Sequence, residues 1–270
     1  MMQTTAENLQ RVWDHRQPAE GPRRDDPSKR FASWLWRKPQ FGILGRLEYL
    51  SGHHRIFNPY GGGPMNGQSV RLEITRWILQ HCDIARIVET GTYRGTTTAW
   101  FAQFALPVVT AEISPRYANF SRARLRRSPN VELRRSDSVT MLAELARADI
   151  DRSAPTLFYL DAHWRDDVPL AEEIAIVTAA FPRAVIMIDD FKVPGDVGYG
   201  YDDYGPGKAL DLDLLRRCRR MPERVFFPAV ASRWETGGRR GCVVFSNDTA
   251  MTKEILRLSL LRSHALRDET

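Results

Sequence analysis

Short apolar segments alternate with amphipathic segments from residue 69 to residue 189, and this alternation restricts the fold more than any other feature. Strands are predicted at 86–90, 107–113, 131–136, 156–161 and 184–189, and helices at 69–82, 95–105, 115–127, 138–148 and 167–181. Strands that alternate with helices of this length form a parallel sheet with helices on both faces. Right-handed crossovers place the carboxyl ends of all these strands at one edge, where such sheets bind ligands.

The pattern changes after residue 190. A helix is predicted at 206–220, and the β-rich runs Val225–Val230 and Cys242–Ser246, joined by a polar loop, predict a hairpin. The last 20 residues have a helical pattern. The sequence therefore predicts an α/β fold with a seven-stranded sheet, mostly parallel and closed by a C-terminal antiparallel hairpin.

The sequence suggests three regions. Residues 1–30 are polar, charged and proline-bearing, which predicts a mobile tail. Residues 31–68 are rich in aromatic and aliphatic side chains and are expected to form an N-terminal extension packed on the core. Residues 69–270 form the predicted main domain, and 270 residues suit one domain of this kind with an extension.

Composition argues against several partners. The net charge of +6 is mild, and the arginine clusters lack interleaved aromatic residues, so nucleic acid is not an expected partner. Cys82, Cys218 and Cys242 show neither disulfide nor metal spacing, which suits the reducing cytoplasm. No signal peptide and no membrane-spanning helix is predicted. A homo-oligomer is left open.

A glycine turn follows the first predicted strand. Gly91 and Gly95 bracket it, Thr96 opens the next helix, and the second strand ends in Glu112, which could accept both ribose hydroxyl protons. The acid Glu89 would repel a pyrophosphate but suits a ligand that carries an ammonium and a sulfonium. The pattern favours S-adenosylmethionine over NAD, the alternative being ordinary turn glycines and a solvated acid.

Three acids follow buried strands. Asp161 ends one strand, and Asp189 and Asp190 end the next, so all three are expected at the same edge. Carboxylates that converge repel one another unless a cation is present, and with water they suit Mg²⁺ or another hard divalent ion. Relief of this repulsion predicts that Asp190→Asn keeps or gains heat stability in EDTA. The alternative is that these acids cap helices or pair with arginines.

Two further features adjoin the acids. His163 could accept a hydroxyl proton as a general base, or it could be a packing residue. Trp164 could cover an adenine ring or lie in the core. The glycine- and tyrosine-rich stretch 192–208 is predicted to be a mobile lid over the site, the alternative being an ordinary solvated loop.

These motifs resemble the metal-dependent class I O-methyltransferases over roughly residues 64–195. VETGTYRGTTT resembles the glycine turn of the catechol-type enzymes, and LDAHW and MIDDF resemble their metal-bearing strand ends; the DD pair also resembles the macrolide- and aminocoumarin-sugar enzymes. The resemblance implies a Rossmann-like methyltransferase fold, with MNGQ lying over the cofactor. The residues assigned to the cofactor are Glu89, Gly91, Tyr93, Gly95, Thr96, Glu112, Asp137, Ser138 and Trp164. Asp161, Asp189 and Asp190 would hold the metal.

One departure affects the base. Arg165 falls near the catalytic lysine of the catechol enzymes, and an arginine stays protonated. His163 and Asp161 are therefore the predicted catalytic residues. The expected reaction is metal-assisted methyl transfer from S-adenosylmethionine to a hydroxyl of a small, sugar-like or polyhydroxylated acceptor. The alternatives are a cephalosporin-type hydroxylase, or another non-methyltransferase enzyme, on the same fold, and a non-catalytic S-adenosylmethionine-binding protein.

Overall fold

The computed structural model describes residues 41–52, 63–163 and 168–266. The chain divides into two units, residues 1–36 and 37–270, and every described residue belongs to the second. The predicted tail 1–30, most of the predicted extension 31–68, and Trp164 and Arg165 lie outside the described residues.

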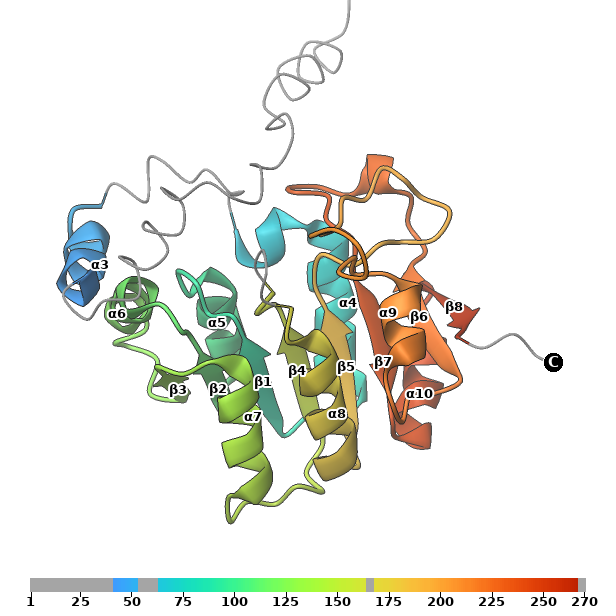
Figure 1. Ribbon diagram of the computed structural model, residues 1–270, viewed down its shortest axis with the longest axis horizontal. Coiled ribbons are helices and arrows are strands. Elements are labelled where there is room, and N and C mark those ends of the chain that lie inside the picture. The colour runs from blue at the N-terminus through green and yellow to red at the C-terminus, as the bar shows by residue number, and fades with distance from the viewer. Residues whose placement is uncertain (1–40, 53–62, 164–167, 267–270) are drawn as a thin grey trace, which may run out of the picture. The chain divides into compact units, whose positions relative to one another are not determined.

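One eight-stranded sheet organises the second unit, with the order β3-β2-β1-β4-β5-β7-β6-β8 (Figure 1). Its parallel strands are β1 (Arg86–Thr90), β2 (Val108–Ala111), β3 (Val131–Arg134), β4 (Thr156–Leu160) and β5 (Ala184–Ile188). Three strands run antiparallel to their neighbours: β6 (Arg224–Pro228), β7 (Val243–Ser246) and β8 (Leu261–Ala265). The five predicted parallel strands and the antiparallel addition are confirmed.

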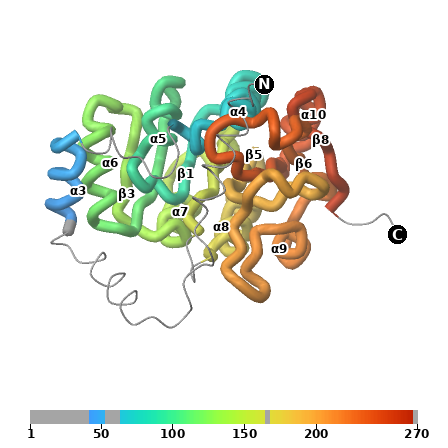
Figure 2. The backbone as a smooth tube through the Cα atoms, turned by 90° about the horizontal axis from the view of Figure 1, so that it is seen from above, coloured from blue at the N-terminus to red at the C-terminus, as the bar shows by residue number. Residues whose placement is uncertain are grey.

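Helices cover both faces of the sheet (Figure 2). One face carries α4 (Ser69–His81), α5 (Thr96–Phe101) and α10 (Thr249–Leu256), and the other carries α7 (Ser138–Arg147), α8 (Leu170–Ala180) and α9 (Leu212–Arg217). Successive strand residues enter opposite cores, so Ile87 packs with the α4 face and Val88 with the α7 face. This two-sided burial explains why the strands are apolar throughout.

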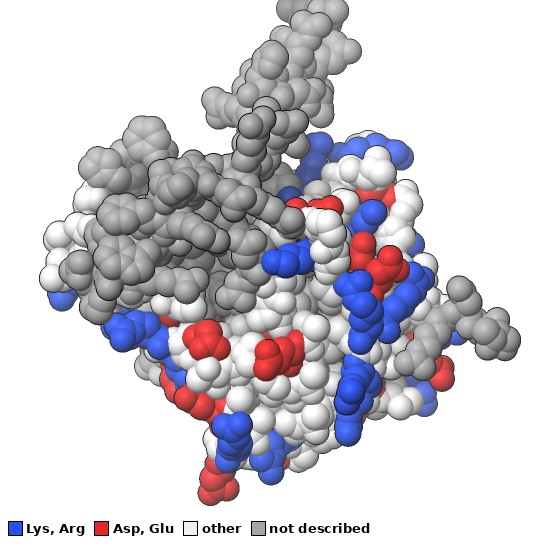
Figure 3. All heavy atoms as spheres, viewed as in Figure 1, with Lys and Arg blue, Asp and Glu red and all other residues white. Residues whose placement is uncertain are grey.

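The remaining elements lie at the edges of these layers. Helix α3 (Phe41–Leu50) packs against α6 (Pro115–Arg124). Short 3-10 helices are η2 (Pro64–Gly67), η3 (Ala102–Phe104) and η4 (Ser232–Trp234). None of the described helices is both long and apolar enough to cross a bilayer. On the face drawn in Figure 3, basic and acidic side chains are interspersed over the described surface.

The C-terminal part differs from the prediction in two places. The predicted helix 206–220 is shorter, and its regular part is α9. The helical pattern of the last 20 residues is confirmed for α10 but wrong for 261–265, which pair with β6 as an eighth strand. The sheet therefore has eight strands and not seven, because a short segment with buried Leu261 extends its edge.

Strand register sets up the functional edge. Thr90 pairs with Ala111 on one side and with Leu160 on the other, and Leu160 pairs with Ile188. The next residue of each strand therefore leaves the sheet at the same edge. These residues are Gly91, Glu112, Asp161 and Asp189.

Candidate functional site

A turn with left-handed residues joins β1 to α5 and approaches the end of β4. Gly91, Tyr93 and Gly95 have φ angles of 83°, 48° and 67°. A Cβ atom on Gly91 would lie 2.2 Å from the carbonyl oxygen of Asp161, so no side chain fits there. Gly95 is the N-cap of α5, and Thr96 is its first residue. The turn thus leaves main-chain atoms directly beside the first of the three acids.

Glu89 lies beneath this turn. Its side chain is 1% exposed, and one oxygen accepts hydrogen bonds from the hydroxyls of Thr98 and Thr110. Burial raises the pKa of Glu89 to about 7, and the two threonine hydrogen bonds oppose this shift. The carboxyl group therefore changes charge near neutral pH.

Glu112 is held by main-chain amides at the end of β2. One oxygen accepts a 2.7 Å hydrogen bond from the Tyr93 N–H, and the other accepts a 2.8 Å bond from the Ser114 N–H. Burial raises the pKa of Glu112 to about 7 against these two bonds. Each oxygen keeps a lone pair, so the group could still accept two further hydroxyl protons.

A pocket opens above the turn. Its volume is about 640 Å³ including the open solvent at its mouth. It is lined by Gly63, Met65, Asn66, Glu89, Gly91, Thr92, Tyr93, Arg94, Thr96, Thr97, Arg124, Asp161 and Asp189. The predicted cofactor residues Glu89, Gly91, Tyr93 and Thr96 are thus brought together with two of the three predicted metal ligands.

Among the described residues, the other predicted cofactor residues do not line the pocket. Gly95 is the N-cap of α5, and Glu112 accepts a hydrogen bond from the Tyr93 N–H of the turn. Asp137 caps α7 by accepting a 2.8 Å hydrogen bond from the Thr140 N–H, and Ser138 is the buried first residue of that helix. A capping role accounts for Asp137 without a ligand.

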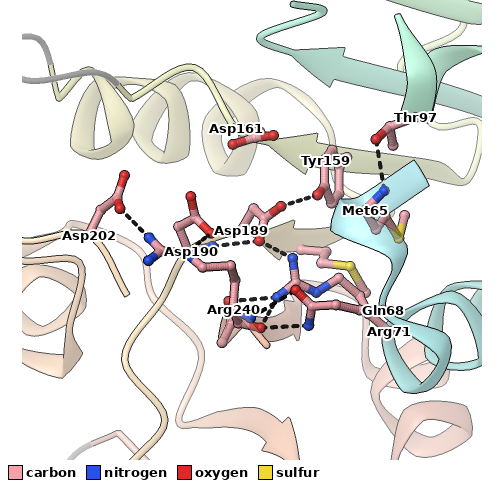
Figure 4. Close-up of polar contacts among 12 residues, drawn as sticks. Met65, Gln68, Arg71, Thr97, Tyr159, Asp161, Asp189, Asp190, Asp202 and Arg240 are labelled. Atoms are coloured by element: carbon pink, nitrogen blue, oxygen red, sulfur yellow. Dashed lines mark hydrogen bonds and ion pairs between the residues drawn. The ribbon is translucent and has the colours of Figure 1, made fainter. Parts of the chain in front are cut away.

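The segment before α4 contains the sequence MNGQ and lines the pocket with Met65 and Asn66. Met65 and Asn66 have φ angles of 49° and 59°, and the Met65 N–H donates a 3.0 Å hydrogen bond to the Thr97 hydroxyl (Figure 4). The Gly238 N–H donates to the Asn66 carbonyl at 2.8 Å. These contacts tie the segment both to α5 and to the loop between β6 and β7.

Asp189 belongs to a buried ion pair. Its side chain and that of Arg71 are each 1% exposed, and the two are in contact (Figure 4). Asp189 also accepts hydrogen bonds from the Tyr159 hydroxyl and the Asp190 N–H. Burial raises its pKa while Arg71 opposes this. These contacts occupy most of the lone pairs of the Asp189 carboxylate. They agree with the alternative stated in the sequence analysis, that these acids pair with arginines.

Asp190 and Asp202 share a second arginine. Arg240 Nε donates to Asp190 Oδ1 at 2.6 Å, and its Nη2 contacts Asp202 Oδ1. Burial acts to raise the pKa of Asp190, but His163 and Arg240 hold it well below the usual range. The carboxylate repulsion expected for Asp190 therefore acts mainly on Asp161. Burial and the neighbouring carboxylates of Asp189 and Asp190 raise the pKa of Asp161 well above its ordinary value.

His163 faces the outer oxygens of this cluster. Its Nε2 lies 3.9 Å from Asp161 Oδ1, 3.9 Å from Asp190 Oδ2 and 3.7 Å from Asp202 Oδ2. Burial acts to lower the pKa of His163, but the surrounding carboxylates raise it overall. Among the described residues, Asp161, His163 and Asp190 could hold a metal ion, because one ligand atom from each lies within 4.8 Å of the others.

The stretch 192–208 is held in place along its length. The Tyr199 hydroxyl donates to the Val230 carbonyl at 2.9 Å, and the Asp202 N–H donates to the Asp190 carbonyl at 2.9 Å. Tyr199 is 2% exposed. The lid stays a prediction, which hydrogen exchange of this stretch without and with ligands would test.

Several residues of the site were not predicted individually. Arg71, Arg240 and Asp202 join the acids, and Arg94, Thr97 and Arg124 line the pocket. Arg71 carried one signal, since it lies three residues before Ile74 and seven before Ile78, on the apolar face of the predicted helix. Asp202 lies in the stretch 192–208 predicted as a lid, and Arg94 and Thr97 lie in the glycine-turn motif, but none of the three was assigned a role.

Comparisons with known proteins extend the fold assignment. No protein-family profile matches this chain, and no curated protein matches it significantly. Cofactor-bound Rv0187 from MTB is 20% identical, with 92% of this chain and 100% of that chain covered and a TM-score of 0.51. WbdD is 13% identical over 66% of this chain, with a TM-score of 0.44, and the match spans 40% of WbdD.

A third solved structure is a SAM-dependent methyltransferase from Agrobacterium tumefaciens, which is 10% identical over 47% of this chain and 46% of that chain, with a TM-score of 0.35. At these identities the likeness concerns the fold alone. The strand order is that of the Rossmann-like α/β sheet predicted from the sequence, and Rv0187 shares this fold along its whole length.

Proposed function

We propose that this protein transfers a methyl group from S-adenosylmethionine to a hydroxyl of a small, polyhydroxylated acceptor, assisted by a divalent metal ion. One observation carries the proposal: the glycine turn after β1 and the acids after β4 and β5 line the same pocket. A cofactor on the turn and an acceptor beside Asp161 would therefore be neighbours, and such proximity supplies much of the rate of a transfer reaction.

Several residues would bind the cofactor. Gly91 and Tyr93 present main chain to it, Glu89 lies where its ammonium and sulfonium would be favoured, and Glu112 would accept the ribose hydroxyl protons. Cofactor binding by five further residues stays a prediction; they are Gly95, Thr96, Asp137, Ser138 and Trp164.

The metal would lie at the acids. Asp161 and Asp190 would hold it, and Asp189, which Arg71 neutralises, would orient Asp190 through the main-chain hydrogen bond between them. A bound divalent ion, Mg²⁺ in the simplest case, lowers the pKa of an acceptor hydroxyl and orients it. The residues fit such an ion, since their oxygens are hard ligands and mutual repulsion raises the pKa of Asp161.

The proton acceptor is open between the two predicted catalytic residues. The carboxylates around His163 raise its pKa, so it is protonated over more of the neutral range and takes up a further proton less readily. Asp161 lines the pocket, whereas His163 is not among the lining residues. Asp161 is therefore the better placed of the two to meet an acceptor.

Calorimetry and product analysis would test this function. Titration with S-adenosylmethionine should give binding that Glu112→Ala weakens, and incubation with polyhydroxylated acceptors should release S-adenosylhomocysteine only when a divalent metal is present. Tight binding of NAD with no binding of S-adenosylmethionine would overturn the proposal. Cofactor binding without any transfer would favour the non-catalytic alternative, and oxygen consumption would favour the hydroxylase. Cytoplasmic location and homo-oligomer formation stay predictions from the sequence.

A further inference from the structure

Helix α3 is tied to the glycine turn through a single carboxylate. Glu48 Oε1 accepts a hydrogen bond from Arg94, which lies between Tyr93 and Gly95 in the turn and lines the pocket. Glu48 Oε2 accepts a 2.8 Å bond from Nε of Arg116, and Arg116 Nη2 lies 2.6 Å from Glu48 Oε2 as well. One acid of α3 therefore joins two arginines from separate segments, and we call this contact the Glu48 bridge.

A second glutamate links the same two segments. Arg116 is the second residue of α6, and the N-cap of that helix is Ser114. The Ser114 N–H and the Tyr93 N–H of the turn both donate to Glu112. Glu48 and Glu112 thus connect the turn to the start of α6, one from α3 and the other from the end of β2.

The Glu48 bridge is largely shielded from solvent. The side chains of Glu48, Arg94 and Arg116 are 16%, 15% and 22% exposed. Isolated ion pairs on a surface contribute little to stability, but networks of several charges contribute more. Without the Glu48 charge, two guanidinium groups on neighbouring segments would repel each other. The carboxylate is therefore needed to keep the turn and the start of α6 together.

Apolar contacts account for only part of the attachment of α3. Four of its bulky side chains are 48% to 69% exposed; they are Ile43, Leu44, Leu47 and Leu50. On the side that faces α6, a Cβ atom on Gly45 would lie 1.9 Å from the Arg116 carbonyl oxygen, so the helix packs there with bare main chain. Tyr49 adds an edge contact with the Phe120 ring. Because so much apolar surface stays exposed, the ion pairs of Glu48 supply a large share of the attachment.

We propose that Glu48 is a positioning residue of the site, which holds the turn and the start of α6 at the spacing that lets Tyr93 and Glu112 face one ligand. The inference rests on the cofactor site proposed above and adds to it a helix none of whose residues lines the pocket. Coupling of this kind between a distant group and a ligand site typically changes affinity by about fivefold or more.

Hydrogen exchange of the ligand-free protein measures the positioning directly. The Tyr93 N–H bonds to Glu112, and the Gly95 N–H bonds to the Thr92 carbonyl at 2.8 Å. Both amides are therefore protected from exchange while the turn keeps its shape. Calorimetric titration with S-adenosylmethionine then measures what the same change does to the ligand.

Three variants separate positioning from a general loss of stability. Glu48→Gln keeps the size of the side chain but removes its charge, so exchange of the two amides should be faster and cofactor affinity weaker, each by about fivefold or more. Adding Arg116→Gln removes the repulsion between the guanidinium groups, so the double variant should recover part of both losses. The matched control is Glu254→Gln in α10, which removes the partner of Arg257 outside the pocket and should change neither measurement.

The outcomes separate the Glu48 bridge from the proposed function. Thermal unfolding confirms that each variant is folded. Unchanged exchange in Glu48→Gln, a double variant without recovery, or unchanged affinity for a cofactor that wild type binds overturns the positioning role. Faster exchange that Arg116→Gln partly reverses upholds this role even if wild type does not bind S-adenosylmethionine, in which case only the proposed cofactor fails.

Discussion

The buried pair of Arg71 and Asp189 gives a stability prediction of defined size. Both side chains are 1% exposed, and the guanidinium also donates to the carbonyls of Arg240 and Gly241, the latter at 2.9 Å. Arg71→Met keeps most of the side-chain volume but leaves the Asp189 carboxylate buried without its cation. Removing one partner of a buried ion pair costs about 3–5 kcal/mol of folding free energy.

Urea and thermal unfolding in EDTA would measure this cost. At about 2–4 °C per kcal/mol for a domain of this size, the Tm of Arg71→Met should fall by about 6–20 °C. The double variant Arg71→Met/Asp189→Asn removes both charges, so its loss should be clearly smaller than the sum of the two single losses. A Tm for Arg71→Met within about 2 °C of wild type, or strictly additive losses, would refute the reasoning.

Four further predictions concern the acids and the turn. S-adenosylmethionine affinity, measured by calorimetry, should fall as the pH is lowered from about 8 to about 6. Burial raises the pKa of Glu89 and Glu112 to about 7, and the ribose hydroxyls need an ionised carboxylate as acceptor. Glu112→Gln should weaken binding at pH 8 at least about tenfold and make the affinity depend less on pH. The same raised pKa values predict the opposite trend for folding stability. The stabilisation that these acids contribute is fully present below their pKa of 4.5 in the unfolded chain and is lost as the pH rises through about 7. Urea unfolding of wild type and Glu112→Gln at several pH values would show this loss. In EDTA, Asp161→Asn should raise Tm by relieving repulsion, and Asp190→Asn should lower it by removing one of the two carboxylates that pair with Arg240. The reverse order would contradict the charge assignment. Gly91→Ala should cost more than about 1 kcal/mol in urea unfolding, since its Cβ would lie 2.2 Å from a carbonyl oxygen at a φ of 83°, and unchanged stability would show that the turn can shift.

Local patterns in the sequence were enough to predict the scaffold. Strands buried on both faces are short apolar runs, and the residue after each run must emerge at one edge, which is why Gly91, Glu112 and Asp161 could be assigned to a common site. The eighth strand was missed because 261–265 forms only through its pairing with β6, a partner that its own residues do not specify.

The charge partners of the site could not be read from local pattern. Arg71 lies 118 positions from Asp189, and Arg240 lies 38 positions from Asp202, so neither pairing follows from periodicity within a segment. For this reason the repulsion predicted for Asp190 falls on Asp161 instead. The fold is determined by residues close in sequence, whereas the electrostatics of the site depends on which distant cations reach each carboxylate.

The contact between Gly91 and Asp161 has an evolutionary consequence. It involves the carbonyl of Asp161 and not its carboxylate, so any amino acid at 161 can offer the same surface to the turn. Substitutions at 161 can therefore abolish or alter metal chemistry while the glycine turn keeps its shape. Descendants of such a chain could lose the proposed metal in a single mutational step and retain the proposed cofactor, whereas a change at position 91 would damage both halves of the pocket at once.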